Sequence, residues 1–124
     1  MSDNVRFLKV GAAAVNVIDL YDIPSKMAEL VDAPKGERTP ADDALLGQTV
    51  NLPVQCILVQ LSGVAVLIDA GDYDVAYDSS GRTNFTPPPG LVESLERFGL
   101  RPEDVGHVVI THAHGDHFNA TTVE

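Results

Sequence analysis

Cysteine and positive charge are both scarce in this chain. One cysteine among 124 residues excludes a disulfide within the chain, and a buried, reduced thiol at Cys56 is the expectation for a cytoplasmic protein. Eighteen acidic residues against eight basic ones give a formal net charge of −10. Because contacts to phosphates depend on clustered Lys and Arg, this balance disfavours a nucleic-acid partner.

Long hydrophobic runs are absent as well. No run reaches the length of a membrane-spanning helix, and the N-terminal residues lack the basic start of a signal peptide. We therefore expect a cytoplasmic protein without a membrane partner. Hydrophobic residues make up 44% of the chain, which is enough to build the core of one small domain.

Short apolar runs predict a sheet. In the first two runs the hydrophobic side chains alternate with polar ones, which is typical of strands. The next two runs are almost continuously hydrophobic and are joined by Ser62-Gly63, which predicts a hairpin in a sheet covered on both faces. A last run, directly before a group of histidines, predicts a buried strand. These strands are expected over residues 5–10, 12–20, 53–61, 63–69 and 108–110.

Two helices and a long loop complete the expected elements. A helix is expected over residues 91–98, because its apolar side chains recur on one face that can pack on the sheet. A short helix is expected over Ser25–Val31, starting after Pro24. Residues 73–90, which include Pro87–Pro89, are expected to form a loop. The apolar face of the longer helix consists of Leu91, Val92, Leu95 and Phe98.

Four potential metal ligands follow the last strand within six residues, in the sequence Thr-His-Ala-His-Gly-Asp-His. If the chain is extended here, His112 and His114 project to the same side, where two imidazoles can approach one ion at about 2.0–2.1 Å each. The glycine allows the chain to turn, so Asp116 and His117 can face an adjacent ion. Imidazole mixed with carboxylate suits zinc, iron or manganese better than calcium or copper(I).

The alternative is that these histidines are ordinary surface or capping residues. A single histidine near the end of a strand is usually a surface or capping residue, and we expect this of His107. The chain has four histidines in all, however, and three of them fall in this short segment. That concentration favours a metal site over chance.

The segment and its upstream context resemble the metallo-β-lactamase superfamily, whose hallmark is His-x-His-x-Asp-His after a strand. The context is a hydrophobic strand that ends in Asp69, followed by a loop, an amphipathic helix and a short turn. The resemblance covers about residues 50–118. It implies an α/β fold, namely the N-terminal half of an αββα sandwich with a mixed sheet and a packed helix. Residues 1–124 would then form a partial domain, truncated after the motif.

The resemblance also implies ligands and chemistry. His112 and His114 would bind the first metal, Asp116 and His117 the second, and Asp69 would support the loop that carries them. Two zinc ions are implied, with iron or manganese as alternatives. In such a site a metal-activated hydroxide cleaves an ester, thioester, lactone or related bond of a small-molecule substrate, and Asp116 is the implied catalytic residue.

The sequence is consistent with more than one activity. The parent protein is expected to be a metal-dependent hydrolase, and the alternative is an iron-dependent redox member of the same superfamily. Four ligands over two sites leave each ion with two, fewer than the three that catalytic zinc normally has. The chain itself is therefore expected to be an incomplete, inactive fragment. Residues 21–50 could rim the active site or form a surface excursion, and the oligomeric state is not predicted.

Overall fold

The computed structural model describes residues 5–32, 34–77, 83–86 and 90–122. The chain divides into two compact units, one formed by Met1–Tyr21 with Val54–Glu124 and the other by Asp22–Pro53. The expectation of a single partial domain over residues 1–124 stays a prediction. None of the described helices is long and apolar enough to cross a membrane.

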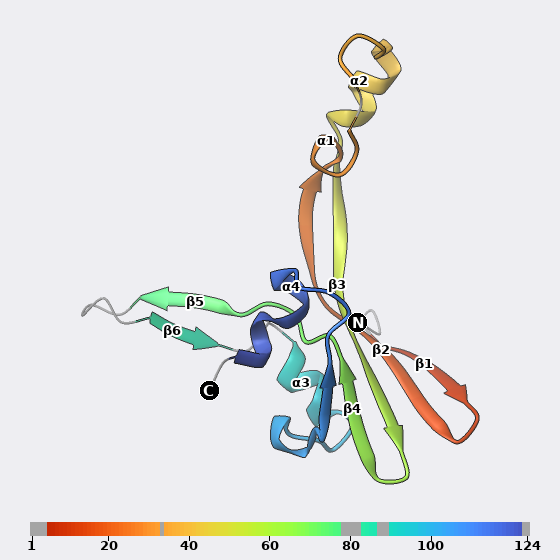
Figure 1. Ribbon diagram of the computed structural model, residues 1–124, viewed down its shortest axis with the longest axis vertical. Coiled ribbons are helices and arrows are strands. Elements are labelled where there is room, and N and C mark those ends of the chain that lie inside the picture. Colours follow the sequence, from red (N-terminus) through yellow and green to blue (C-terminus); the bar gives the residue numbers. More distant parts are fainter. Residues whose placement is uncertain (1–4, 33, 78–82, 87–89, 123–124) are drawn as a thin grey trace. The chain divides into compact units, whose positions relative to one another are not determined.

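A mixed five-stranded sheet forms the body of the larger unit (Figure 1), in the order β1-β2-β3-β4-β7. Neighbouring strands are antiparallel at β1–β2 and β3–β4, whereas β4 and β7 are parallel. A parallel pair requires a crossover, and the chain between β4 and β7 supplies it with a short hairpin, helix α3 and the 3-10 turn η1. The strands are β1 (Val5–Val10), β2 (Ala13–Lys26), β3 (Thr49–Leu61), β4 (Val64–Ile68) and β7 (His107–Val109).

The hairpin between β3 and β4 confirms the prediction at Ser62-Gly63. Both residues have positive φ angles, 51° at Ser62 and 80° at Gly63. This combination is typical of the two-residue turn whose twist matches that of antiparallel strands. It places Leu61 opposite Val64 and sets the register that continues to Ile57 and Ile68.

The core lies between one face of this sheet and helix α3 (Leu91–Glu96). Every second residue of the central strands is buried, and Leu95 of α3 is 1% exposed. Leu91 and Leu95 line a cavity of about 230 Å³ together with Leu67 of β4 and Val108 of β7. Helix α3 therefore packs on the sheet, as its sequence predicted. The buried strand residues are Asn16, Ile18, Leu20, Val54, Cys56, Leu58, Ala65 and Leu67.

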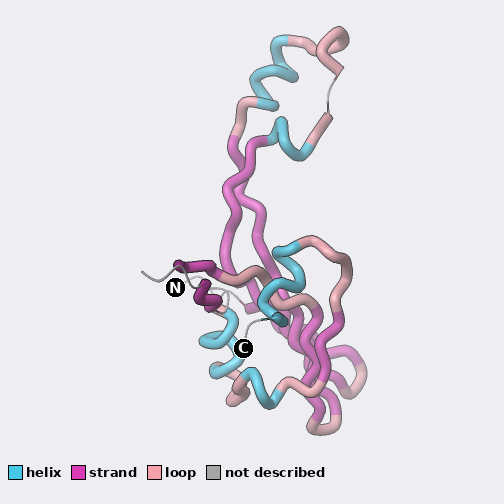
Figure 2. The backbone as a smooth tube through the Cα atoms, turned by 60° about the vertical axis from the view of Figure 1, so that its left-hand side comes forward, coloured by secondary structure: helices cyan, strands magenta, loops and turns pink. Residues whose placement is uncertain are grey.

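The smaller unit holds two short helices, α1 (Met27–Leu30) and α2 (Pro40–Leu46), at the end of the strand segments that enter and leave it (Figure 2). Helix α2 was not predicted. Its start has a capping box, in which the Thr39 hydroxyl accepts from the Asp42 N–H and the Asp42 carboxylate accepts from the Thr39 N–H. Thr39-Pro40-Ala41-Asp42 is therefore the sequence signal that could have identified this helix.

Strand β7 is not buried as predicted. Val108 and Val109 are 45% and 49% exposed, because β7 is the last strand of the described sheet and pairs with β4 alone. The prediction of a sheet covered on both faces is also wrong for the described residues, for a different reason. Alternate residues of β4, such as Val66 and Ile68, are only half-buried, so α3 covers one face of the strands.

Two expectations about secondary structure also need correction. The predicted loop over residues 73–90 contains a two-stranded antiparallel sheet, β5 (Asp74–Tyr77) with β6 (Thr83–Thr86), whereas Pro87–Pro89 lie outside the described residues. The predicted helix over Ser25–Val31 is shorter because β2 continues to Lys26 and includes Pro24. Proline is tolerated there because the described register of β1 with β2 ends at Ile18.

The burial of Cys56 yields a first testable prediction. Burial and, to a smaller extent, the nearby Asp69 charge raise the pKa of its thiol to about 12. The thiol is therefore neutral at pH 8 and shielded from reagents in the native state. We expect 5,5′-dithiobis(2-nitrobenzoate) to react with Cys56 no faster than the chain unfolds, and to react at once in denaturant. Rapid reaction under native conditions, followed by absorbance, would contradict this core packing.

Candidate metal centre

The candidate site lies where β4 and β7 end on the same side of the sheet. The parallel pairing of these strands brings Asp69, directly after β4, beside the segment after β7 that carries the histidines. The Asp69 N–H donates to the Val109 carbonyl at 2.8 Å and so prolongs the pairing by one bond. The carboxyl ends of parallel strands meet at one edge, which is why residues 42 positions apart converge here.

Asp69 is the buried acceptor at the centre of this site. It is 7% exposed and has a φ of 57°, a left-handed conformation that Asp adopts more readily than most residues. One carboxylate oxygen accepts from the Thr111 N–H at 2.8 Å. The other accepts from the Thr111 hydroxyl at 2.7 Å and from His117 Nδ1 at 2.8 Å. Asp69 thus supports the ligand loop, as the family resemblance implied.

These bonds keep Asp69 ionised. Burial by itself raises the pKa of the carboxyl, but the bonds from the Thr111 backbone and the His117 ring, followed by that from the Thr111 hydroxyl, outweigh it. The net result is a pKa below the ordinary value. An ionised carboxylate only accepts hydrogen bonds, so its partners must donate.

That requirement assigns the protons on two imidazoles. His117 must carry its proton on Nδ1, which leaves the lone pair of Nε2 available. The Thr111 hydroxyl gives its only proton to Asp69, so it accepts from His112 Nδ1 at 3.0 Å. The lone pair of His112 is therefore also on Nε2. Asp69 sets both tautomers, one directly and the other through Thr111.

The three imidazoles lie together on the exposed side of Asp69. His112 Nε2 lies 3.1 Å from His114 Nδ1, and their ring centroids are 4.7 Å apart. The ring of His117 lies 3.9 Å from that of His112. Residues 111–113 form a bend, so this approach results from the bend and not from strand alternation as predicted.

Asp116 and His117 form a second pair on helix α4 (Gly115–Phe118). His117 Nε2 lies 3.5 Å from Asp116 Oδ2. Two ligands of a tetrahedral zinc ion are about 3.3 Å apart, given bond lengths of about 2.0–2.1 Å. The separations in both pairs, 3.1 Å and 3.5 Å, are close to that value. The donor chemistry and spacing of each pair therefore fit one ion.

The residues present supply two donors for each ion and not three. Among the described residues, no group of three or more His, Cys, Asp or Glu side chains is arranged to hold a metal ion. His107 does not add to either pair; it is the exposed first residue of β7 and pairs with Val66. The described residues therefore provide two neighbouring pairs of candidate ligands, each too few to complete a zinc site.

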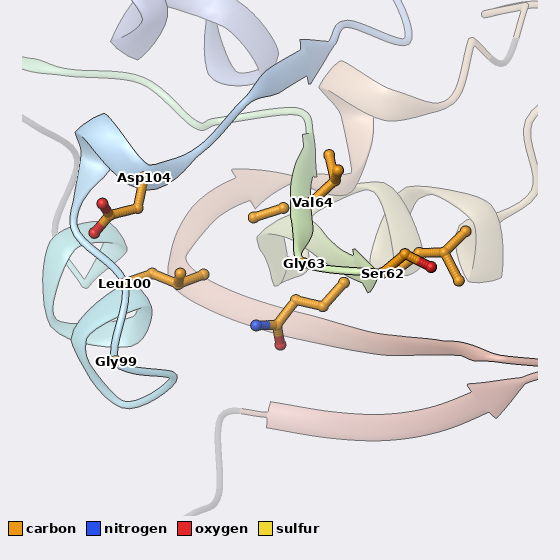
Figure 3. A pocket seen from close by; sticks show the side chains of 9 residues that line it. Ser62, Gly63, Val64, Gly99, Leu100 and Asp104 are labelled. Carbon is orange, nitrogen blue, oxygen red and sulfur yellow. The ribbon is translucent and has the colours of Figure 1, made fainter.

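A hollow of about 520 Å³ lies at the other end of β4 and has no part in this site. Figure 3 shows Leu100 and Asp104 on one side of it and Val64 on the other. Asp104 is the only titratable residue in its lining, and that carboxylate is already paired with Arg101 at 3.4 Å. The lining of this larger hollow therefore holds no group of side chains comparable to the histidine segment.

Sequence reasoning missed two residues beside the site. Asp72 accepts from the side-chain amide of Asn119 at 2.9 Å, next to helix α4. Neither residue belongs to the motif, and neither stands in a pattern with a known chemical role. Only the fold brings them together, across 47 positions of sequence.

Comparison with known proteins decides the family. The model of the metallo-beta-lactamase superfamily matches residues 49–121, which include β3, β4, α3, β7 and the histidine segment. The chain belongs to the metallo-beta-lactamase superfamily. Its mixed α/β sheet with a packed helix is accordingly part of the sandwich of that family, as expected.

Curated relatives within the superfamily are N-acyl homoserine lactonases. The lactonase of Bacillus thuringiensis is 29% identical over 115 residues, covering 83% of this chain and 44% of the relative. The lactonase AiiB of Agrobacterium fabrum is 29% identical over 89 residues, covering 64% of this chain and 32% of the relative. The chain thus spans less than half the length of these relatives.

Solved structures share the fold of this chain. AidC, a dizinc quorum-quenching lactonase in complex with a product, superposes with a TM-score of 0.67 at 17% identity, covering 98% of this chain and 40% of AidC. A probable metal-dependent hydrolase from Staphylococcus aureus has the same TM-score at 20% identity, covering 94% and 43%. These similarities concern the fold.

The role of Asp69 can be tested by its effect on stability. Asp69→Ala leaves the Thr111 N–H and His117 without their buried acceptor, so we expect the free energy of unfolding to fall by about 3 kcal/mol. Asp69→Asn tolerates the positive φ and should lose less. Asp104→Ala is the matched control, because Asp104 also accepts a backbone N–H but is exposed. Urea unfolding at pH 7 measures all four chains.

The pH dependence checks the same prediction. A carboxyl whose folded pKa is lowered contributes stability above its unfolded pKa of about 3.9, and that contribution is lost as the pH falls through the folded value. The difference in unfolding free energy between the native chain and Asp69→Asn should therefore be full at pH 7 and shrink below about pH 4. A difference that is independent of pH would show that the Asp69 charge is not what holds Thr111 and His117.

Proposed function

We propose that this chain carries the first ligands of a dinuclear metallo-hydrolase that opens a lactone or cleaves a related ester or thioester. The observation that supports the proposal is the pair of neighbouring donor sets, His112 with His114 and Asp116 with His117, at ligand spacing. The names of the curated relatives support a lactone as the substrate class. Zinc is the metal we propose, since AidC is described as dizinc.

Each residue has a separate task in this proposal. The rings of His112 and His114 would hold the first ion, and His117 Nε2 with the Asp116 carboxylate would hold the second. Asp69 prepares the site, because its bonds put the lone pairs of His112 and His117 on Nε2, the nitrogens that face His114 and Asp116. When bound, the two ions would supply an attacking water of lowered pKa and a Lewis acid for the acyl carbonyl.

The Asp116 carboxylate would move the proton of the reaction. The water oxygen forms a bond to the acyl carbon, and the bond from that carbon to the ring oxygen breaks. Asp116 would accept the proton that the water loses and return it to the ring oxygen, which becomes a hydroxyl. The product is then a hydroxy acid, and no oxidant or further reactant is needed.

A complete site requires more ligands than the described part of the chain provides. Catalytic zinc normally has three protein ligands, and each donor pair here supplies two. We therefore propose that a longer protein containing this chain supplies the remaining ligands, and that the 124 residues alone are inactive. A cytoplasmic location and the absence of a nucleic-acid partner stay predictions.

Zinc titration of the 124-residue chain tests the ligand assignment. We expect weak binding in isothermal titration calorimetry, reduced about tenfold or more by His114→Ala or by Asp116→Ala. His107→Ala is the matched control, because His107 lies outside both donor pairs. If neither ligand variant changed zinc affinity, or if His107→Ala reduced it equally, the assignment would be wrong.

Turnover tests the proposed reaction. The longer protein, loaded with zinc, should open an N-acyl homoserine lactone, and proton release measured with a pH indicator should stop after chelation. Asp116→Ala should lower the rate by about a hundredfold or more, because it removes a ligand and a proton carrier together. Iron in the purified protein with no lactone turnover would instead favour the redox alternative. Chelator-resistant turnover by the 124-residue chain would refute the metal mechanism.

A further inference from the structure

Besides the bonds of Asp69, hydrogen bonds from backbone and side chain join the loop after β4 to the segment from α4 to the 3-10 turn η2 (Asn119–Thr122). The Ala70 N–H donates to the His117 carbonyl at 2.9 Å, and the Ala120 N–H donates to the Gly71 carbonyl at 3.2 Å. A further bond is between side chains, from Asn119 Nδ2 to Asp72 Oδ1 at 2.9 Å. The loop after β4 therefore holds the backbone of α4 at His117 and again just after the helix, at Asn119 and Ala120.

Asp72 is itself anchored and can act as a fixed point. The same oxygen that accepts from Asn119 also accepts from the Tyr73 N–H at 2.8 Å. The Asp72 N–H donates to the Tyr21 hydroxyl at 3.1 Å, which ties the loop to strand β2. Asn119 thus connects helix α4 through Asp72 to the sheet.

Gly115 leaves the space in which the Asn119 amide lies. A Cβ atom at residue 115 would be 2.6 Å from Asn119 Nδ2 and 3.3 Å from Asn119 Cγ. It would also be 3.6 Å from Asp72 Oδ2. The amide therefore occupies the position of a side chain at residue 115, beside the first turn of α4. A methyl group there would displace the amide from Asp72.

We infer that Asp72 and Asn119 are positioning residues for the second metal, acting through the placement of Asp116 and His117. The inference rests on the proposed function, in which these two residues are ligands. Both lie on α4, between Gly115 and Asn119, so the Asn119–Asp72 bond fixes the backbone that carries them. The His112 ring is held by Thr111, and His114 touches α4 only through its carbonyl, which accepts from the His117 N–H at 2.9 Å, so the first pair should depend less on this bond.

Amide hydrogen exchange of the metal-free chain tests the positioning without any metal. In Asn119→Ala and in Asp72→Ala, exchange at Ala70 and Ala120 should accelerate about tenfold or more, as expected for loss of a hydrogen bond to a charged group. Exchange at Gly106, whose N–H donates to the Ala65 carbonyl at 2.9 Å, should not change. Equal acceleration at all three amides would mean that the variants only destabilise the fold, and would overturn the inference.

Two further variants separate a positioning role from others. Asp72→Asn keeps an oxygen that can accept from Asn119, so it should retain the exchange protection that Asp72→Ala loses. Gly115→Ala should accelerate exchange at Ala70 and Ala120 in the native chain but not in an Asn119→Ala background, where the methyl group has room. Fully additive effects of Gly115→Ala and Asn119→Ala would refute the steric coupling. Asp104→Ala is the control for removal of an exposed carboxylate.

Zinc binding provides the second readout and keeps the two proposals separable. In a chain that retains only the second pair (His112→Ala with His114→Ala), Asn119→Ala should weaken zinc binding about tenfold in an NMR titration. In a chain that retains only the first pair (Asp116→Ala with His117→Ala), the loss of zinc affinity should be clearly smaller. An equal loss in both chains would overturn the inference. If His114→Ala and Asp116→Ala left zinc affinity unchanged while the exchange results were as expected, the proposed function would fail. The role of Asp72 and Asn119 in holding α4 would still stand.

Discussion

The buried carboxylate of Asp69 is the interaction on which the rest of the site depends. It lies at the point where β4 ends, in a left-handed backbone conformation that turns the chain out of the sheet. From there it accepts three hydrogen bonds from Thr111 and His117, which follow the parallel strand β7. A buried charge is stable only when such partners surround it, so the fold and the histidine segment require each other. The same bonds decide which nitrogen of His112 and of His117 has a free lone pair, and this links the stability of the sheet to the chemistry of the site.

Residues close in sequence bring the candidate ligands together, whereas residues distant in sequence orient them. The four donors come from six consecutive residues, so their proximity needs little more than a bend and one short helix. Their orientation depends on partners 42 to 48 positions away, in the loop after β4. Hydrogen bonds within the protein hold the segment that carries both candidate pairs. Holding donors in place in advance lowers the conformational entropy that binding must otherwise overcome.

The sequence predicted those features that depend on local chemistry. Ser62-Gly63 specified the hairpin, and the spacing of Leu91 and Leu95 specified the face of α3 that is buried. The four candidate ligands of the motif also lie close together in the structure, as two neighbouring pairs. Prediction failed where the outcome depends on which elements are neighbours: the apolar run at Val108 and Val109 resembles a buried strand, yet it lies exposed at the end of the described sheet. The contact between Asp72 and Asn119 could not be predicted either, because neither residue has a pattern of its own and only the parallel pairing of β4 with β7 brings their loops together.

Gly115, within the motif, has one role that the local sequence suggests and another that only the fold reveals. As a sequence feature, Gly115 reads as a residue that lets the chain turn between the two donor pairs. In the structure its φ is not in the left-handed region, and what matters is the missing side chain, because the Asn119 amide lies in that space. A side chain at residue 115 and an amide at residue 119 are therefore alternatives for the same volume. A larger residue in the middle of the motif would require α4 to be held in another way, so residues 72, 115 and 119 support the second donor pair together, in addition to Asp69 and Ala70.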